Sequence, residues 1–129
     1  LCEKMEENGE FHPTMKLSQG KITLPARKQV HRVVDKRGKF VKDIIALHGE
    51  DAEGKPLLIK VMENGRIIYD LPTIEEIRKN ASENLSRLPE KHKRFRSSLD
   101  YPVHLSPRLE KLVNTLTREL KKIEVESHP

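Results

Sequence analysis

The chain has 129 residues, of which 35% are hydrophobic and 35% charged, and its 25 Lys and Arg against 20 Asp and Glu give a net charge of +5. This length fits one domain, and the low apolar content predicts a thin core that gains from packing against a larger body. No apolar run reaches the roughly 20 residues of a membrane-spanning helix, and the single cysteine, Cys2, excludes an internal disulfide and a C-x-x-C site.

Residues 1–71 are predicted to form antiparallel β hairpins. Asn-Gly pairs at 8–9 and 64–65 supply the left-handed positions that tight hairpin turns need. The richest β signal is a run of β-branched residues at 29–34, followed by a turn at 35–38. The expected strands are 1–5 with 14–17, 29–34 with 39–47, and 57–62 with 66–69.

Residues 72–126 are predicted to be helical. Thr73 and Glu76 have the spacing of a capping box, and Pro89 stops or kinks the first helix. Ser106 and Pro107 fit the N-cap and first position of the second helix. The expected helices cover residues 73–92 and 106–124, joined by a linker at 93–103. The expected fold class is α+β, a single domain 1–129 in which both helices cover one face of an antiparallel sheet.

Residues with the spacing of a catalytic, cofactor-binding or metal site do not emerge from the sequence. No two histidines have ligand spacing, and the nearest cluster, His48 with Glu50 and Asp51, is better explained as a solvated acidic turn. Glycines are scattered and form no phosphate-binding loop. We therefore predict no catalytic residue, no cofactor-binding residue and no metal ligand in this chain.

One locally basic stretch, residues 91–96, contains an aromatic, Phe95. A single-stranded nucleic acid would need several such aromatics for stacking, so binding to nucleic acid is not favoured. We interpret the stretch as a solvated link anchored by Phe95, and a small basic RNA- or protein-binding module is the alternative. The lone thiol and the absence of a signal-peptide pattern predict a cytoplasmic protein without a membrane partner.

Five stretches, taken in order, resemble bacterial nicotinate phosphoribosyltransferases. They are MKLS and KITLPARKQVHR (15–18 and 21–32), DIIAL (43–47), the helical region 75–89, and YPVHLSPRL (101–109). Two positions depart from the family pattern. Ala26 stands where the family usually has Gly, which predicts a backbone without strain there, and His31 stands where it usually has an aromatic residue.

The resemblance implies the C-terminal domain of an enzyme that makes nicotinate mononucleotide in NAD biosynthesis, from nicotinate and phosphoribosyl pyrophosphate with ATP hydrolysis. We expect a fragment of that longer enzyme, structural in role and inactive alone. Its implied partners are the barrel and N-terminal domains of the same enzyme, with a homodimer partner as a further candidate. ATP and Mg²⁺ are expected for the full-length enzyme, and no cofactor for this chain.

Overall fold

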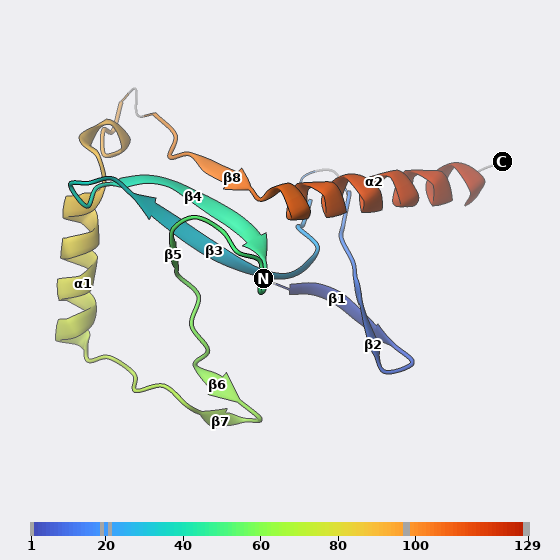
Figure 1. Cartoon of the computed structure of the whole chain (residues 1–129), viewed down its shortest axis with the longest axis horizontal. Helices are drawn as coiled ribbons and strands as arrows, with labels where there is room; N and C mark the ends of the chain where they lie inside the picture. Colours follow the sequence, from blue (N-terminus) through green and yellow to red (C-terminus); the bar gives the residue numbers. More distant parts are fainter. Residues whose placement is uncertain (1, 19, 21, 97–98, 128–129) are drawn as a thin grey trace.

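A six-stranded sheet lies at the centre of the molecule, with one helix at each side (Figure 1). The computed structural model describes residues 2–18, 20, 22–96 and 99–127, and the expectations for Leu1 and His128 lie outside this part. The strands are β1 (Cys2–Glu7), β2 (Glu10–Pro13), β3 (Ala26–Val34), β4 (Phe40–Leu47), β5 (Lys55–Pro56) and β8 (Val103–Leu105). Their order is β2-β1-β3-β4-β8, with β5 also paired to β3. The expected α+β class is confirmed.

The first hairpin is tighter than expected. Asn8 and Gly9 both have positive φ, 53° and 78°, which fits the two-residue turn that Asn-Gly favours. The chain therefore returns at once as β2, so the prediction of a returning strand at 14–17 is wrong. Pro13 ends β2 at the outer edge of the sheet, where its missing N–H costs no ladder hydrogen bond.

The third hairpin is short and stands apart from the sheet. It consists of β6 (Met62–Glu63) and β7 (Arg66–Ile67) around the predicted Asn64-Gly65 turn. Most of the expected strand 57–62 is irregular. It meets the sheet at its start, where the Leu57 N–H donates to the Val30 carbonyl and Leu58 exchanges two hydrogen bonds with the Gln29 amide. Every residue from 53 to 83 is exposed, so this arm of the chain contributes nothing to the core.

Helix α1 (Ile74–Arg87) begins as predicted and ends earlier than expected. The Thr73 hydroxyl accepts from the Glu76 N–H while the Glu76 carboxylate accepts from the Thr73 N–H, which is a full capping box. Leu88 is extended because Pro89 disfavours a helical residue before it. A short 3-10 turn, η1 (Glu90–His92), follows.

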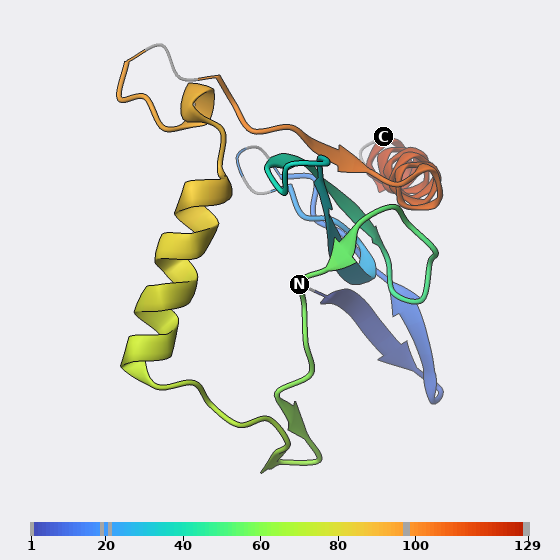
Figure 2. The same ribbon diagram turned by 60° about the vertical axis from the view of Figure 1, so that its left-hand side comes forward.

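The prediction that both helices cover the sheet is wrong for α1. None of its residues is buried, and Figure 2 shows the helix standing away from the strands over most of its length. The apolar positions at helical spacing, Ile77 and Leu85 among them, stay exposed at 49% and 58%. An apolar stripe predicts that a helix buries one face; it does not say against what.

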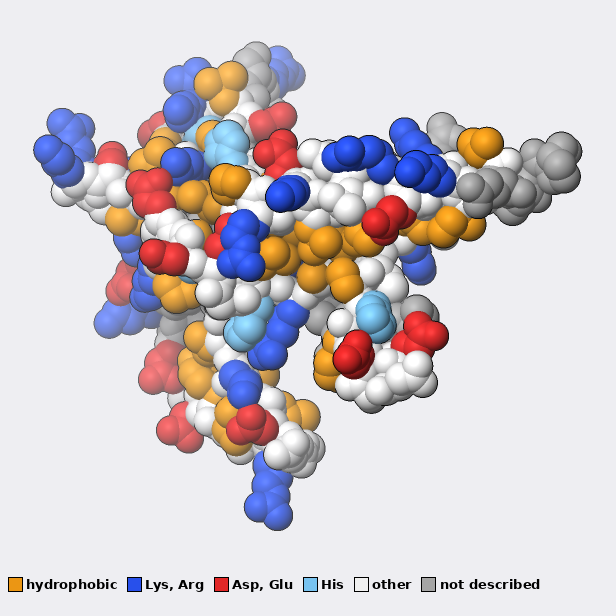
Figure 3. All heavy atoms as spheres, turned by 45° about the vertical axis from the view of Figure 1, so that its right-hand side comes forward, with side chains coloured by type: hydrophobic (Ala, Val, Ile, Leu, Met, Phe, Trp, Pro, Cys, Tyr) orange, Lys and Arg blue, Asp and Glu red, His pale blue; other side chains and the backbone are white. Residues whose placement is uncertain are grey.

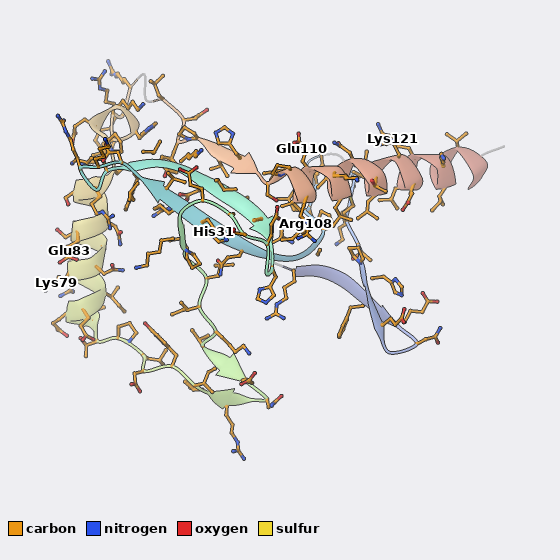
Figure 4. All side chains as sticks on the ribbon, viewed as in Figure 1. His31, Lys79, Glu83, Arg108, Glu110 and Lys121 are labelled. Atoms are coloured by element: carbon orange, nitrogen blue, oxygen red, sulfur yellow. The ribbon has the colours of Figure 1, made fainter. Side chains whose placement is uncertain are left out.

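Helix α2 (Pro107–Ser127) does pack on the sheet, near β4. The Ser106 hydroxyl caps it by accepting from the Leu109 N–H, and Leu109 is fully buried. Figure 3 shows hydrophobic side chains along one side of α2, while Figure 4 shows Lys121 on the other. The small core that results consists of Met15, Val33, Phe40, Ala46 and Leu109.

Strand β8 corrects the expectation of a purely antiparallel sheet. Residues 103–105 follow the predicted linker and pair parallel to β4, with Ile44 opposite His104. The pairing is non-local, so no hairpin turn announces it in the sequence. Among the described residues, no helix is long and apolar enough to cross a membrane.

Ala26 contradicts the expectation of an unstrained backbone. Its φ is +64°, in the left-handed region that glycine adopts without cost and alanine does not. It begins β3, where β1 joins the sheet through the pairing of Glu3 with Ala26. The backbone thus keeps the conformation that suits glycine, although the residue here is alanine.

Candidate functional site

The side-chain cluster that joins the sheet to α1 starts with a cross-strand ion pair. Arg32 on β3 lies opposite Asp43 on β4, so both side chains leave the same face of the sheet. The Arg32 guanidinium donates to both carboxylate oxygens, at 2.9 Å and 2.7 Å. The Tyr101 hydroxyl donates to the same carboxylate at 3.1 Å, and only 8% of Asp43 is exposed. The fork geometry suits an arginine and would not be reproduced by a lysine.

Phe40 connects this pair to the helix. Its ring lies 4.5 Å from the Arg32 guanidinium and 4.9 Å from that of Arg87, distances at which a cation is attracted to the ring. Arg87 also donates from Nε to the Gly38 carbonyl at 2.7 Å, and Lys39 Nζ donates to the Ser86 carbonyl at 2.7 Å. These contacts attach the last turn of α1 to the β3–β4 turn.

The cluster changes the protonation behaviour of two of its members. The hydrogen bonds to Asp43 raise the pKa of Arg32, although burial acts in the opposite direction. Burial raises the pKa of Tyr101 to about 12, and the neighbouring Asp43 carboxylate adds to that rise. Both groups therefore keep their protons throughout the physiological range, which makes this cluster a fixed charge arrangement and a poor proton donor.

A cleft of about 380 Å³ opens between α1 and strands β3 and β5, and we call it the cationic cleft. Its described lining includes three cations, two amides and several apolar side chains, and no acidic residue. A second hollow of about 330 Å³, which includes Tyr101, shares part of this lining. The residues that line the cationic cleft are Arg32, Val34, Phe40, Lys55, Pro56, Leu57, Ile59, Asn80, Asn84 and Arg87.

Local backbone geometry brings β5 to this position. Gly54 has φ of +104°, and a Cβ there would lie 2.7 Å from the Arg32 carbonyl oxygen, so only glycine fits. The following residue, Lys55, lies directly opposite Arg32. On the other side, Asn84 donates to Asn80 at 2.9 Å along one face of α1. The cleft thus has a basic floor on the sheet and an amide wall on the helix.

The predicted acidic turn has a structural role. The Glu50 carboxylate accepts from the Leu47 N–H at 2.9 Å and from the Ser106 hydroxyl at 2.7 Å, so it ties the loop after β4 to the start of α2. His48 and Asp51 are exposed. Within residues 2–18, 20, 22–96 and 99–127, no three His, Cys, Asp or Glu side chains gather as a metal site would require.

The remaining histidines of the described residues do not form a cluster. His31 is buried on β3, and its Nδ1 has no hydrogen-bond partner in the described part of the chain. His92 donates from Nδ1 to the Leu99 carbonyl at 2.6 Å, and its ring meets the Tyr101 ring edge-on with the centroids 5.5 Å apart. His12 and His104 lie on separate strands, β2 and β8.

The basic stretch 91–96 faces solvent for the most part, as expected, and Lys93 pairs with Glu90 at 2.7 Å. The prediction that Phe95 anchors it is wrong, because this side chain is fully exposed. Conversely, the cationic cleft was not predicted. The register counted from the turn at 35–38 would place Arg32 opposite Val41. The structure pairs Val34 with Phe40, and an irregularity between Val33 and Val34 shifts the partner of Arg32 further, to Asp43. Nothing in the sequence places Arg87 or Lys55 beside this pair.

Comparison with known proteins gives consistent matches. The family model for the nicotinate phosphoribosyltransferase C-terminal domain matches residues 48–113. The chain is 36% identical to a nicotinate phosphoribosyltransferase of Mycobacterium tuberculosis over 88% of its own length and 24% of that protein. It is 33% identical to the human nicotinate phosphoribosyltransferase, over 81% of its own length and 24% of that protein. It thus spans about a quarter of the length of these curated relatives.

A solved structure agrees with these relatives. The crystal structure of human nicotinic acid phosphoribosyltransferase superposes with a TM-score of 0.69 at 30% identity, over 79% of this chain and 24% of that one. The matched family region, residues 48–113, includes α1, β8 and one side of the cationic cleft. The exposed arm is therefore part of the region that this chain has in common with the family.

Proposed function

Because the chain belongs to the family of nicotinate phosphoribosyltransferase C-terminal domains, we propose that residues 1–129 are one such domain of an enzyme with that activity. The reaction would join nicotinate to phosphoribosyl pyrophosphate with ATP hydrolysis, giving nicotinate mononucleotide and pyrophosphate in the cytoplasm. The match of residues 48–113 to the family model, together with relatives named nicotinate phosphoribosyltransferase, carries the proposal.

The role proposed for the domain is structural, and its catalytic partners lie outside it. Isolated domains rarely expose large contiguous apolar surface, and such surface usually marks an interface. Here the arm exposes Ile59, Ile67 and Leu71 at 59%, 61% and 69%. The barrel and N-terminal domains of the same enzyme are the proposed partners for this surface, with a homodimer partner as the second candidate.

The two carboxylates held in side-chain clusters, Asp43 and Glu50, do not fit Mg²⁺, which the family's reaction calls for together with ATP. Mg²⁺ prefers carboxylate oxygens that remain free to coordinate it. The Asp43 carboxylate already accepts from Arg32 and Tyr101, and Glu50 is occupied by Leu47 and Ser106. We therefore place the binding of both groups, together with the catalytic residues, in other parts of the enzyme.

An activity assay tests this function directly. The isolated chain and a longer product that includes a barrel would each be incubated with nicotinate, phosphoribosyl pyrophosphate and ATP. We expect nicotinate mononucleotide from the longer protein alone. Turnover by the isolated chain would contradict the accessory role, and an inactive longer protein that is folded would contradict the proposed activity.

A further inference from the structure

The cationic cleft has a charge imbalance that the described residues do not resolve. Lys55 and Arg32 lie directly opposite one another on β5 and β3, an arrangement of like charges that destabilises a sheet unless it is compensated. Asp43 neutralises Arg32. Lys55 forms no ion pair within the described part of the chain. Arg87 stacks on Phe40 and donates one hydrogen bond, from Nε to Gly38, and it has no carboxylate partner among the described residues.

Glu83 is the acidic residue of α1 closest in sequence to Arg87, and it does not face the cationic cleft. Figure 4 shows Glu83 on the side of α1 turned away from the sheet, together with Lys79. The two terminal nitrogens of Arg87 are thus free to take a carboxylate in the bidentate manner that arginine favours. One external carboxylate between Arg87 and Lys55 would balance the charge of the cleft.

We propose that an acidic segment of the enzyme's remaining chain, from the same subunit, occupies the cationic cleft, with an Asp or Glu between Arg87 and Lys55 and apolar residues on either side of it. This inference rests on the proposed function, because it takes the occupant from the same enzyme. The amides of Asn80 and Asn84 provide hydrogen-bonding partners for its backbone.

A polypeptide fits the surroundings better than a small anion does. The apolar part of the lining includes Leu57 and Ile59, and the neighbouring hollow adds the exposed Leu85. A phosphate or a free carboxylate would neutralise the cations and leave these apolar faces in water. A segment with apolar residues beside its acid covers both, which is the usual composition of an interface centre with charged groups at its rim.

The attachment of α1 leaves room for such a segment. The helix is fixed to the sheet at its last turn, through Arg87 with Gly38 and Ser86 with Lys39. Toward its first turn it stands clear of the strands (Figure 2). An inserted chain would therefore lie along the open side of α1 without breaking any contact within this domain.

Photo-crosslinking in the full-length enzyme tests the proposal. Benzoylphenylalanine would replace Ile59 in the cleft, or Lys79 on the outer side of α1 as the control. We expect position 59 to crosslink to a peptide of the same subunit that contains Asp or Glu, and position 79 to give little of that product. A dominant crosslink from position 59 to a peptide without an acid, or to the other subunit in mixed isotopically labelled dimers, would overturn the proposal.

Reversing the charge of Lys55 provides a second test of the proposal. Lys55→Glu breaks no ion pair among the described residues and should lower the crosslink yield from position 59 about two- to fivefold, the range of an exposed ion pair, whereas Lys79→Glu should leave it unchanged. An unaltered yield in Lys55→Glu would refute the role of charge. Nicotinate phosphoribosyltransferase activity is measured in parallel. An active enzyme whose crosslink from position 59 goes to a peptide without an acid, or to the other subunit, refutes only the proposed occupant of the cleft. A full-length enzyme that is folded but inactive before any substitution refutes the proposed function.

Discussion

Asp43→Asn is the substitution that most directly measures how much the Arg32–Asp43–Tyr101 cluster stabilises the domain. Asparagine has the same shape, so packing is kept while the charge is lost. Its single carbonyl oxygen can still accept from Arg32 Nε and from Tyr101, but its amide nitrogen meets the second Arg32 donor, which originally lay 2.7 Å from a carboxylate oxygen. One charge-assisted hydrogen bond is replaced by two donors facing each other.

The expected magnitude follows from burial. A hydrogen bond to a charged group contributes about 1.5–3 kcal/mol, and breaking a fully buried ion pair costs about 3–5 kcal/mol. The side chain of Asp43 is 11% exposed and that of Arg32 is 28% exposed, so Arg32 regains some water when its partner is lost. We therefore expect the free energy of unfolding to fall by about 2–3 kcal/mol.

Urea unfolding of the 129-residue chain, followed by circular dichroism, provides the measurement. Glu63→Gln is the matched control, because it removes a carboxylate from the exposed Lys60–Glu63 pair and should leave the unfolding midpoint unchanged. Arg32→Met combined with Asp43→Asn should cost less than the sum of the two single changes. A midpoint in Asp43→Asn equal to that of the control would refute the central role of this pair.

Three further changes test the described geometry. Ala26→Gly should raise the free energy of unfolding by a few tenths to about 1 kcal/mol, because it relieves the positive φ, whereas Ala46→Gly in the core should lower it by about 1 kcal/mol in the same urea titration. Since Tyr101 has its pKa raised from 10.0 to about 12, the folded state binds its proton more tightly, so stability is complete below pH 10 and is lost as pH rises toward 12. Tyr69→Phe isolates the Tyr101 signal for a tyrosinate absorbance titration, and an ordinary midpoint would contradict the burial of Tyr101. Thr73→Ala should destabilise α1 by about 1 kcal/mol, seen as faster amide exchange confined to its first turn, and exchange that is faster across the whole sheet would contradict a local cap.

Local signals in the sequence predicted local structure well. The turns at 8–9 and 64–65 have the backbone conformation that Asn-Gly dictates, and the capping box at Thr73 forms as its spacing predicts. These features depend on residues within four positions of each other, so their physics is contained in the segment itself. The same holds for Ser106, whose hydroxyl caps α2.

Non-local structure was predicted poorly, and for a common reason. The pairing of β8 with β4 brings together residues about sixty positions apart, and no turn between them fixes the register. The cationic cleft joins Lys55, Arg32 and Arg87 from three elements in the same way. Periodicity correctly predicted an apolar stripe on α1. We assigned that stripe to the sheet because the sheet was the only packing partner that the sequence predicted.

The stability of α1 leads back to that missing partner. The helix has 14 residues, and isolated helices of this length are marginal in water even with favourable sequences. Within this domain its support comes from the Thr73 cap at one end and the Arg87 and Ser86 contacts at the other, while its apolar positions lie in solvent. A sequence with an N-terminal capping box and a clear apolar stripe is adapted to a helix that is packed. The surface that packs it is therefore to be sought beyond these 129 residues, and the unbalanced cations beside it indicate that this surface is acidic.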